Sequence, residues 1–245
     1  MGLYSKADGC VYYSAKDNDV SGDQLFAYHI SDNKVERLTD SLFAINYILP
    51  RKEDIILASY DKKRKELKFI SEDDDINIEC IGFDNSNGEK YYTAEYSEKE
   101  DFENRDNFNT RKVKSHVAPV HSIYEYDNNE KTLIYKTDNK MISAITANEN
   151  YVLWKEYNES FLGPFTLKML DLETKGIEEI NIDGIGTVSE LSLNPQNTGF
   201  YFSGVLEGEE KRGIYYYDLN TETIEEAIRQ GQNEFINNFM MMKSN

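Results

Sequence analysis

Cysteine is scarce in this chain of 245 residues, and its two cysteines, Cys10 and Cys80, lie far apart. Zinc sites and dithiol redox sites use closely spaced cysteines, so neither is indicated, and two buried thiols are favoured over a disulfide. No run approaches the roughly 18 apolar residues of a membrane-spanning helix. The opening MGLYSKADGC lacks the basic start and apolar run of a signal peptide. We therefore expect no membrane insertion and, for the chain as written, a cytoplasmic location; an excerpt from a longer envelope protein would be extracytoplasmic.

Basic residues are also few, since 27 Lys and Arg stand against 45 Asp and Glu, for a net charge of −18. A chain this acidic repels phosphate polymers, which argues against binding of nucleic acid or anionic membranes. The sequence contains no GxSxG nucleophile elbow, P-loop, dinucleotide fingerprint or HExxH motif. It therefore predicts no cofactor, no metal and no catalytic residue, and it favours a non-enzymatic role while leaving enzymatic activity undecided.

One short stretch, KDNDVSGDQLFAY, resembles the start of a calcium-binding loop. Such a loop needs a bidentate Glu at its twelfth position, and Tyr28 stands there instead. We therefore interpret Asp17–Asp23 as a turn between two strands.

Aromatic residues are abundant, with 18 Tyr and 12 Phe, and many of them lie in a repeated pattern. Five segments share an apolar run, a polar turn and a second alternating run, which is typical of a strand, a turn and a strand. They begin at Leu25, Leu67, Ile123, Leu167 and Ile214, and so are separated by 42, 56, 44 and 47 residues. A period of roughly 40 to 50 residues suits a four-stranded propeller blade.

One further strand candidate precedes each hairpin, at residues 10–15, 54–60, 90–96, 151–157 and 199–205. Three of these are themselves preceded by another candidate, at residues 43–50, 141–148 and 188–195. The sequence thus predicts one all-β domain over residues 1–245, a β-propeller of four-stranded antiparallel blades, with five blades favoured. Because GLYSK is short for a first strand, we expect Phe235–Lys243 to pair beside the amino-terminal strand and close the ring. The alternative is a fragment of a six- to eight-bladed propeller.

The stretch VYYSAKDNDVSGDQLFAYHISDNKVERLTD resembles the repeat of TolB-like, WD-repeat-like propellers, which also occurs in prolyl-oligopeptidase-type propeller domains. The matching positions are Ser14, the Asp17–Asp23 turn, Leu25, Tyr28, Asp32, Leu38 and Thr39. Later segments keep a D-L-x-T turn, in YYYDLNTETIEEA and KMLDLETKGIEEI. The resemblance implies a propeller fold, which serves many different functions.

The long interval of 56 residues points to an insertion loop at about Ser97–Ser122, with a degenerate strand as the other interpretation. Long loops in compact domains are often functional. Its basic and imidazole side chains are candidate ligand contacts for an anionic ligand or acidic partner segment: Arg105, Arg111, Lys112, Lys114, His116 and His121. A metal shared by the two histidines would require the loop to fold back and is not expected.

Three aromatic residues of one predicted strand, Tyr151, Trp154 and Tyr157, are further candidates, because such rings stack on sugars or anchor peptides. Packing between blades is the favoured role for at least one face of that strand. Among many acidic residues, Asp8, Asp54 and Glu190 lie near expected first strands or their turns. We expect a binding or scaffolding propeller that recognises a protein or peptide. The alternatives are a carbohydrate-active enzyme with carboxylates in the channel, which would bind a carbohydrate ligand, or a sensor domain.

Overall fold

The structure is a computed structural model that describes residues 2–5, 9–16, 23–39, 45, 47–50, 55–58, 68–69, 76–83, 90–127, 130–137, 139–158, 164–231 and 236. The chain divides into two compact units. Unit 1 comprises Met1–Ile76 and Asn87–Glu89, and unit 2 comprises Asn77–Ser86 and Lys90–Asn245. The fold is all-β apart from one helix among the described residues, and that helix is too short and too polar to cross a membrane.

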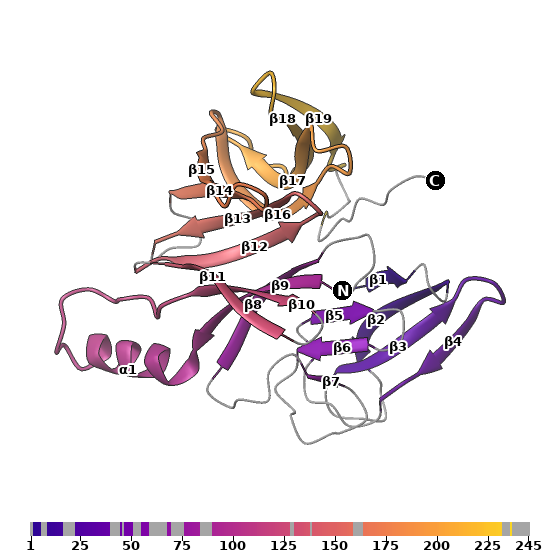
Figure 1. The fold of residues 1–245 in the computed structure, drawn as a ribbon, viewed down its shortest axis with the longest axis horizontal. Coiled ribbons are helices and arrows are strands. Elements are labelled where there is room, and N and C mark those ends of the chain that lie inside the picture. Colours follow the sequence, from indigo (N-terminus) through magenta and orange to yellow (C-terminus); the bar gives the residue numbers. More distant parts are fainter. Residues whose placement is uncertain are drawn as a thin grey trace. The chain divides into compact units, whose positions relative to one another are not determined.

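Unit 2 is built from three four-stranded antiparallel sheets in which each strand pairs with the next one along the chain (Figure 1). The first consists of β8 (Ile76–Phe83), β9 (Lys90–Ser97), β10 (Ser122–Asp127) and β11 (Glu130–Lys136). The second consists of β12 (Met141–Ala147), β13 (Tyr151–Tyr157), β14 (Phe165–Asp171) and β15 (Ile177–Ile180). The third consists of β16 (Ile185–Leu193), β17 (Gly199–Leu206), β18 (Gly213–Asp218) and β19 (Thr223–Arg229). These are propeller-type blades, and the three predicted hairpins of this region are confirmed.

Unit 1 contains a fourth sheet of the same kind, made of β1 (Gly2–Ser5), β2 (Cys10–Lys16), β3 (Asp23–His29) and β4 (Lys34–Arg37). A three-stranded sheet consists of β5 (Tyr47–Pro50), β6 (Ile55–Ala58) and β7 (Lys68–Phe69). In it β5 is antiparallel to β6, whereas β7 is parallel to β6. The described chain therefore has four complete four-stranded blades rather than the five that we predicted.

The difference arises in the segment LKFISEDDDINIEC, which the sequence pattern predicted to be one hairpin. Of its first half the structure describes Lys68–Phe69, which is strand β7, whereas Ile76–Phe83 is β8 and belongs to the next sheet. β8 has eight residues, as does its neighbour β9. The run that we assigned to the hairpin of a separate blade is therefore the first strand of the blade of β9.

The predicted first strand beside β2 also differs. β1 pairs with β2 in an antiparallel register that joins Gly2 to Tyr13 and Ser5 to Cys10. Four residues therefore suffice for this strand, and the place that we assigned to Phe235–Lys243 is taken by the amino-terminal segment. Of residues 235–243 the structure describes only position 236, so ring closure by that segment lies outside the described residues.

Several other expectations fall on residues outside the described ranges, including the turn at 17–22, Asp8 and Asp54. The side chain of Cys80 is not described either. Cys10, in contrast, is a buried thiol on β2 whose Sγ lies 3.1 Å from Nδ1 of His29 on β3.

The turns of the last two blades have the chemistry that the D-L-x-T pattern predicts. The Oδ1 atom of Asp171 accepts hydrogen bonds from the backbone N–H groups of Glu173 and Thr174, at 2.9 and 2.7 Å. Asp218 repeats the arrangement with Asn220 and Thr221, at 2.8 and 3.0 Å. Each Asp thus satisfies two backbone donors that the chain reversal leaves without a strand partner.

The main core of unit 2 lies between its second and third sheets. Its fully buried members include Leu153, Leu167, Val188, Phe200 and Phe202. Burying one such side chain contributes roughly 1.5–3 kcal/mol. The last strands of the blades, by contrast, are largely exposed and rich in charge, as in β15 and β19. Charged outer strands discourage edge-to-edge association of sheets.

Candidate functional site

The insertion between β9 and β10 contains a helix, α1 (Glu98–Asn109), where the sequence predicted an irregular loop or a degenerate strand (Figure 1). Ser97 caps its start, because the Ser97 Oγ atom accepts a hydrogen bond from the N–H of Glu100 at 3.0 Å. The first turn carries three acidic residues, which the positive end of the helix dipole favours. The pattern S-x-x-E at Ser97–Glu100 is a helix-start signal that the sequence analysis missed.

The end of α1 is equally well defined. The N–H of Arg111 donates to the carbonyl of Phe108 at 3.0 Å, and the N–H of Lys112 donates to that of Asn107 at 2.9 Å. This pair of bonds is a Schellman motif, which requires a left-handed residue after the cap. Arg111 is that residue, with φ of 57°, at a position where glycine is usual.

None of the twelve residues of α1 is buried. Phe102 is 71% exposed and Phe108 is 44% exposed, and the loop that follows exposes Val113 and Val117. Two ion pairs hold the segment together: Arg105 to Asp101 at 2.8 Å, and Lys112 to Asp106 at 3.4 Å. The Oε2 atom of Glu100 also accepts the N–H of Val120 at 3.3 Å, which ties the start of the helix to the returning segment. The helix is therefore held chiefly by its caps and this bond, with a small contribution from the ion pairs, and not by burial in the core.

The predicted basic candidates all lie on this insertion. Arg105 and Lys112 use their charges in the two ion pairs. Arg111 and Lys114 are exposed and make no ion pair with any described residue. His116 packs edge-on against the ring of Phe108, with ring centroids 6.2 Å apart. The structure thus brings four of the candidates, Arg111 to His116, into one short loop.

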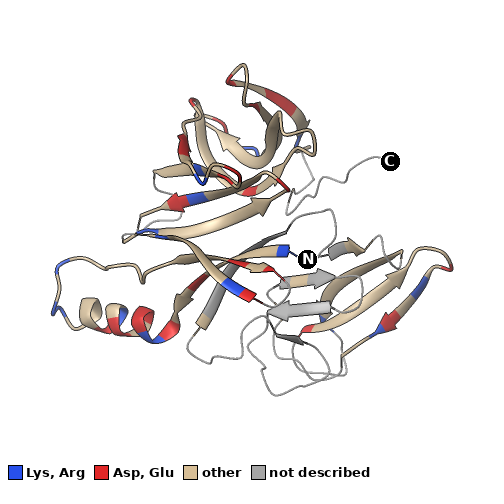
Figure 2. Ribbon diagram, viewed as in Figure 1, with Lys and Arg blue, Asp and Glu red and all other residues tan. Residues whose placement is uncertain are grey.

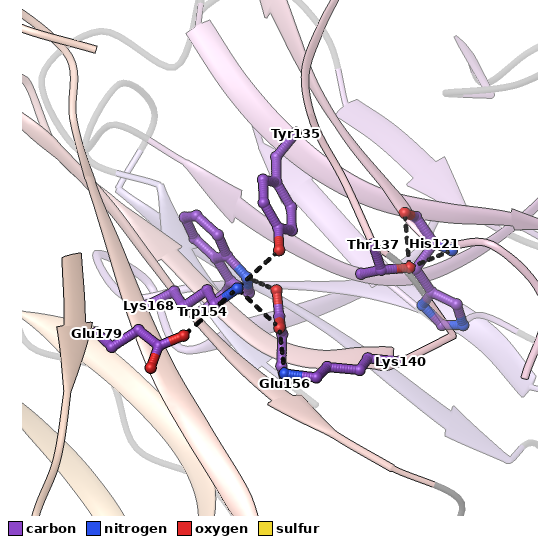
Figure 3. Close-up of polar contacts among 8 residues, drawn as sticks. All are labelled: His121, Tyr135, Thr137, Lys140, Trp154, Glu156, Lys168 and Glu179. Atoms are coloured by element: carbon purple, nitrogen blue, oxygen red, sulfur yellow. Dashed lines mark hydrogen bonds and ion pairs between the residues drawn. The ribbon is translucent and has the colours of Figure 1, made fainter. Parts of the chain in front are cut away.

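His121, in contrast, belongs to the sheet. It is fully buried, and its ring stacks on Tyr96 with centroids 4.8 Å apart. Its Nδ1 atom accepts the N–H of Ile142 at 3.1 Å, which ties the blade of β9 to β12. Its backbone N–H and carbonyl are both bonded to Thr137, at 3.0 and 2.8 Å (Figure 3). His121 is therefore a structural link between two blades at the point where the insertion returns.

Burial lowers the pKa of His121 to about 4, while the nearby carboxylate of Asp101 opposes part of this effect. The imidazole is consequently neutral at physiological pH, with Nδ1 as the acceptor and the proton on Nε2.

No group of three or more His, Cys, Asp or Glu side chains within the described ranges is arranged to hold a metal ion.

A second set of polar residues lies between the first and second sheets of unit 2, and we call it the interblade cluster: Tyr135, Lys140, Trp154, Glu156 and Lys168 (Figure 3). Glu156 is at its centre, with a side chain that is 1% exposed. Its Oε1 atom accepts the indole N–H of Trp154 at 3.0 Å. Its Oε2 atom lies 3.2 Å from the Nζ atom of Lys168 and 3.5 Å from that of Lys140.

The interblade cluster joins two blades, because Tyr135 comes from β11 and the others come from β13, β14 and the segment before β12. The Lys168 ammonium donates to the Tyr135 hydroxyl at 2.9 Å. Burial alone would raise the pKa of Glu156, but hydrogen bonds from Tyr135, Trp154 and Lys168 hold this pKa below its ordinary value. Burial would likewise lower the pKa of Lys168, yet Tyr135 and Glu156 raise it. Both charges are therefore kept in place in the interior.

The three aromatic candidates of β13 are core residues. Trp154 is fully buried against Tyr135, with ring centroids 4.9 Å apart, and Tyr157 is 5% exposed. Tyr151 is half-buried and packs at the edge of the main core. Their burial leaves little ring surface for stacking on a ligand, so they serve chiefly as packing between blades.

Lys155, on the face of β13 opposite Trp154, was not singled out from the sequence. It is 1% exposed, and its ammonium donates to the carbonyl of Val188 on β16 at 2.7 Å. It also lies over the rings of Tyr157 and Phe165. Burial lowers the pKa of Lys155 to about 8. The signal for Lys155 and Glu156 was present in YVLWKEY, where two charges interrupt an otherwise apolar strand.

Strands β12 and β16, the first strands of adjacent blades, pack against each other, and both are bulged at the level of this lysine. Lys155 pairs with Ser143, and the register of β12 shifts next to Ser143, at Ala144, whose φ is 54°. The register of β16 shifts between Val188 and Glu190. Burial raises the pKa of Glu190, and only the charge of Arg212 opposes it. Bulges are common beside active sites, and Glu190 is the one of the three acidic candidates that lies within the described residues.

The structure is similar to several solved structures. An oligogalacturonate lyase in complex with manganese aligns with a TM-score of 0.59 and 12% identity, over 93% of this chain and 64% of that one. A puromycin-hydrolyzing peptidase from Mycobacterium tuberculosis aligns with a TM-score of 0.58 and 10% identity, over 93% of this chain and 37% of the peptidase. TolB from Acinetobacter baumannii aligns with a TM-score of 0.48 and 9% identity, over 96% of this chain and 44% of TolB.

At such low identities the first two matches show the fold alone, and the TM-score for TolB carries no argument. The predicted propeller-type fold is confirmed, whereas membership of the TolB-like or WD-repeat families is not shown. No protein-family model matches the sequence, and no curated protein matches it either. The chain covers less than two thirds of the length of the lyase and of the peptidase, at 64% and 37%.

Proposed function

We propose that this chain is a non-enzymatic binding protein that recognises a protein or peptide partner through the insertion, residues 97–122. One observation carries this proposal: α1 buries none of its twelve residues, yet it is capped at both ends and reinforced by ion pairs. Isolated helices of this length are marginal in water. A helix that adds nothing to the core and is still specified in this detail is best explained by a role at the surface.

Phe102 is the expected anchor of this surface. It is the most exposed large apolar residue among those described, at 71%. Residues three and four positions away on a helix are its neighbours, and here they are Glu98, Lys99, Arg105 and Asp106. An aromatic ring within a polar rim is the usual arrangement of an interface hot spot.

The test is site-specific photocrosslinking in the cells that make the protein, with a photoreactive phenylalanine analogue at position 102. The matched control carries the same analogue at Ile228, which is 54% exposed on β19. We expect a discrete crosslinked product from position 102 and none in common with position 228. The absence of any product at 102, or identical products at both sites, would contradict the proposal.

A second candidate function, a carbohydrate-active enzyme, has Glu190 in its favour. Glycosidases need one carboxyl with a raised pKa as general acid and a second carboxylate nearby. Glu190 meets the first condition, whereas the buried Glu95 and Glu156 are each paired with a lysine. The fold of an oligogalacturonate lyase makes oligogalacturonate a reasonable first substrate to assay. Hydrolysis that Glu190→Gln abolishes and Glu178→Gln leaves intact would establish this function; no hydrolysis of oligogalacturonate by the wild type would remove this substrate.

A further inference from the structure

We infer that the insertion's partner is a second copy of this chain, bound through antiparallel pairing of the two insertions. This inference rests on the proposed function and specifies its partner. Its basis is the distribution of charge along residues 98–117 and the apolar side chains exposed there.

The insertion is electrically neutral on a strongly acidic protein. Residues 98–117 contain five acidic and five basic side chains, whereas the whole chain carries −18. Two copies of such a protein repel each other wherever their acidic surfaces meet. A helix of twelve residues is about 18 Å long, which exceeds the Debye length of about 8 Å at physiological ionic strength. Two insertions that lie side by side in opposite directions therefore hold the acidic bodies about one helix length apart.

The charge within the insertion is divided between its two halves (Figure 2). Residues 98–106 carry five acidic and two basic side chains, a net charge of −3, and residues 111–114 carry three basic ones, a net charge of +3. Antiparallel pairing about a two-fold axis brings each basic segment against the acidic half of the other copy. Parallel pairing would align like charges. The insertion is thus complementary to itself in one orientation.

Side chains for such a contact are present in both halves. Glu103, Arg111 and Lys114 are exposed and make no ion pair with another residue in the part of the chain that the structure describes. Phe102 and Phe108 supply exposed apolar surface between them. An interface of one short helix and loop from each copy belongs to the small class, below about 1,200 Å², which is weak and transient.

The decisive experiment is a charge exchange followed by sedimentation velocity on the purified full chain, from about 5 µM to about 300 µM, where small interfaces associate. Variant A carries Arg111→Glu and Lys114→Glu, and variant B carries Glu98→Lys and Glu103→Lys. We expect the wild type to dimerise as concentration rises, and roughly tenfold weaker dimerisation in 0.5 M salt and in A or B alone. An equimolar mixture of A and B should regain the dimer, because each acidic segment again faces a basic one.

Two single variants separate this surface from another exposed apolar side chain. Phe102→Ser should weaken the dimer, whereas Ile228→Ser on β19 should leave it unchanged. A wild type that stays monomeric over the whole range overturns the inference. So does a dimer that A, B and Phe102→Ser leave intact, since it would use another surface. If the wild type stays monomeric while position 102 still crosslinks to a different protein, the partner is not a second copy. The inference then fails, and the proposed function stands.

Discussion

The insertion and the interblade cluster lie in the same unit and use charged residues in opposite ways. In the interblade cluster Glu156 and Lys168 are 1% and 14% exposed, and their hydrogen bonds join two blades. In the insertion most charges lie on the surface, with Asp101, at 13%, as the exception, and no residue of α1 as a whole is buried. Buried charges must be paired and bonded to be tolerated, whereas exposed pairs contribute little to stability. The comparison therefore supports a role of the interblade cluster in holding the fold, and it is consistent with the recognition role that we propose for the insertion.

The largest expected effect is in the interblade cluster. Glu156→Gln leaves Lys168 without its carboxylate in the interior, so it should lower the free energy of unfolding by about 3–5 kcal/mol. Glu179→Gln is the matched control, because Glu179 also faces Lys168, at 3.9 Å, but is 59% exposed; its effect should be within about 0.5 kcal/mol. Urea titration followed by the fluorescence of the single, buried Trp154 measures both. If the two variants lose the same free energy of unfolding, the buried charges do not hold the fold in the way that the comparison requires.

The next effect concerns pH and His121. Its pKa in the folded chain is about 4, below its ordinary value of 6.5, so the unfolded chain takes up the proton first. The stability that neutral His121 contributes is complete above pH 6.5 and is lost as pH falls toward 4. The difference between these two pKa values corresponds to about 3 kcal/mol of the free energy of unfolding.

The measurement is urea unfolding at pH 7 and pH 4.5 for the wild type, His121→Gln and His29→Gln. Carboxylates add their own acid dependence in all three proteins. The wild type and His29→Gln should therefore lose more stability on acidification than His121→Gln does. NMR titration of the three histidines gives a direct check, and an apparent pKa of 6 or above for His121 would count against its burial between blades.

The sequence predicted the local features of the fold better than the pairing of strands into sheets. Alternating apolar residues and Asp-rich turns are local signals, and they predicted the hairpins of β10–β11, β14–β15 and β18–β19 correctly. Assignment of a strand to its sheet is a long-range matter. Ile76–Phe83 reads as the second half of a hairpin that begins at Leu67, yet it pairs with β9, the next strand along the chain, and so belongs to a different sheet. The blade number was wrong for that reason.

The candidate site was predicted less well. The position of the insertion and its basic loop were visible as excess length and charge, but the capping pattern at Ser97 and the i, i+4 pair of Asp101 and Arg105 were overlooked, and with them α1. The interblade cluster could not be assembled from sequence, because Tyr135, Glu156 and Lys168 lie on three strands. Only the charges inside YVLWKEY hinted at buried partners.

A smaller effect is expected at the end of α1. Arg111 occupies a left-handed conformation that glycine adopts without strain, so Arg111→Gly should stabilise the helix by up to about 1 kcal/mol, partly offset by the greater freedom of glycine when unfolded. Slower amide hydrogen exchange within Glu98–Asn109 would report it. Asn197→Gly, at φ of 60°, is the control, and its gain should be smaller because Asn tolerates this conformation. Faster exchange in Arg111→Gly would mean that the arginine side chain supports the helix.

The account's central claim, that the insertion serves recognition and not folding, is tested most directly by removing it. Residues 99–114 are replaced by a short Gly/Ser turn, and the free energy of unfolding is measured by urea titration of Trp154 fluorescence. Because α1 buries no side chain and loop length enters stability only at about 0.6 kcal/mol per doubling, the shortened chain should unfold within about 1 kcal/mol of the wild type. A loss of several kcal/mol would contradict the claim, since the insertion would then be part of what holds the blade together.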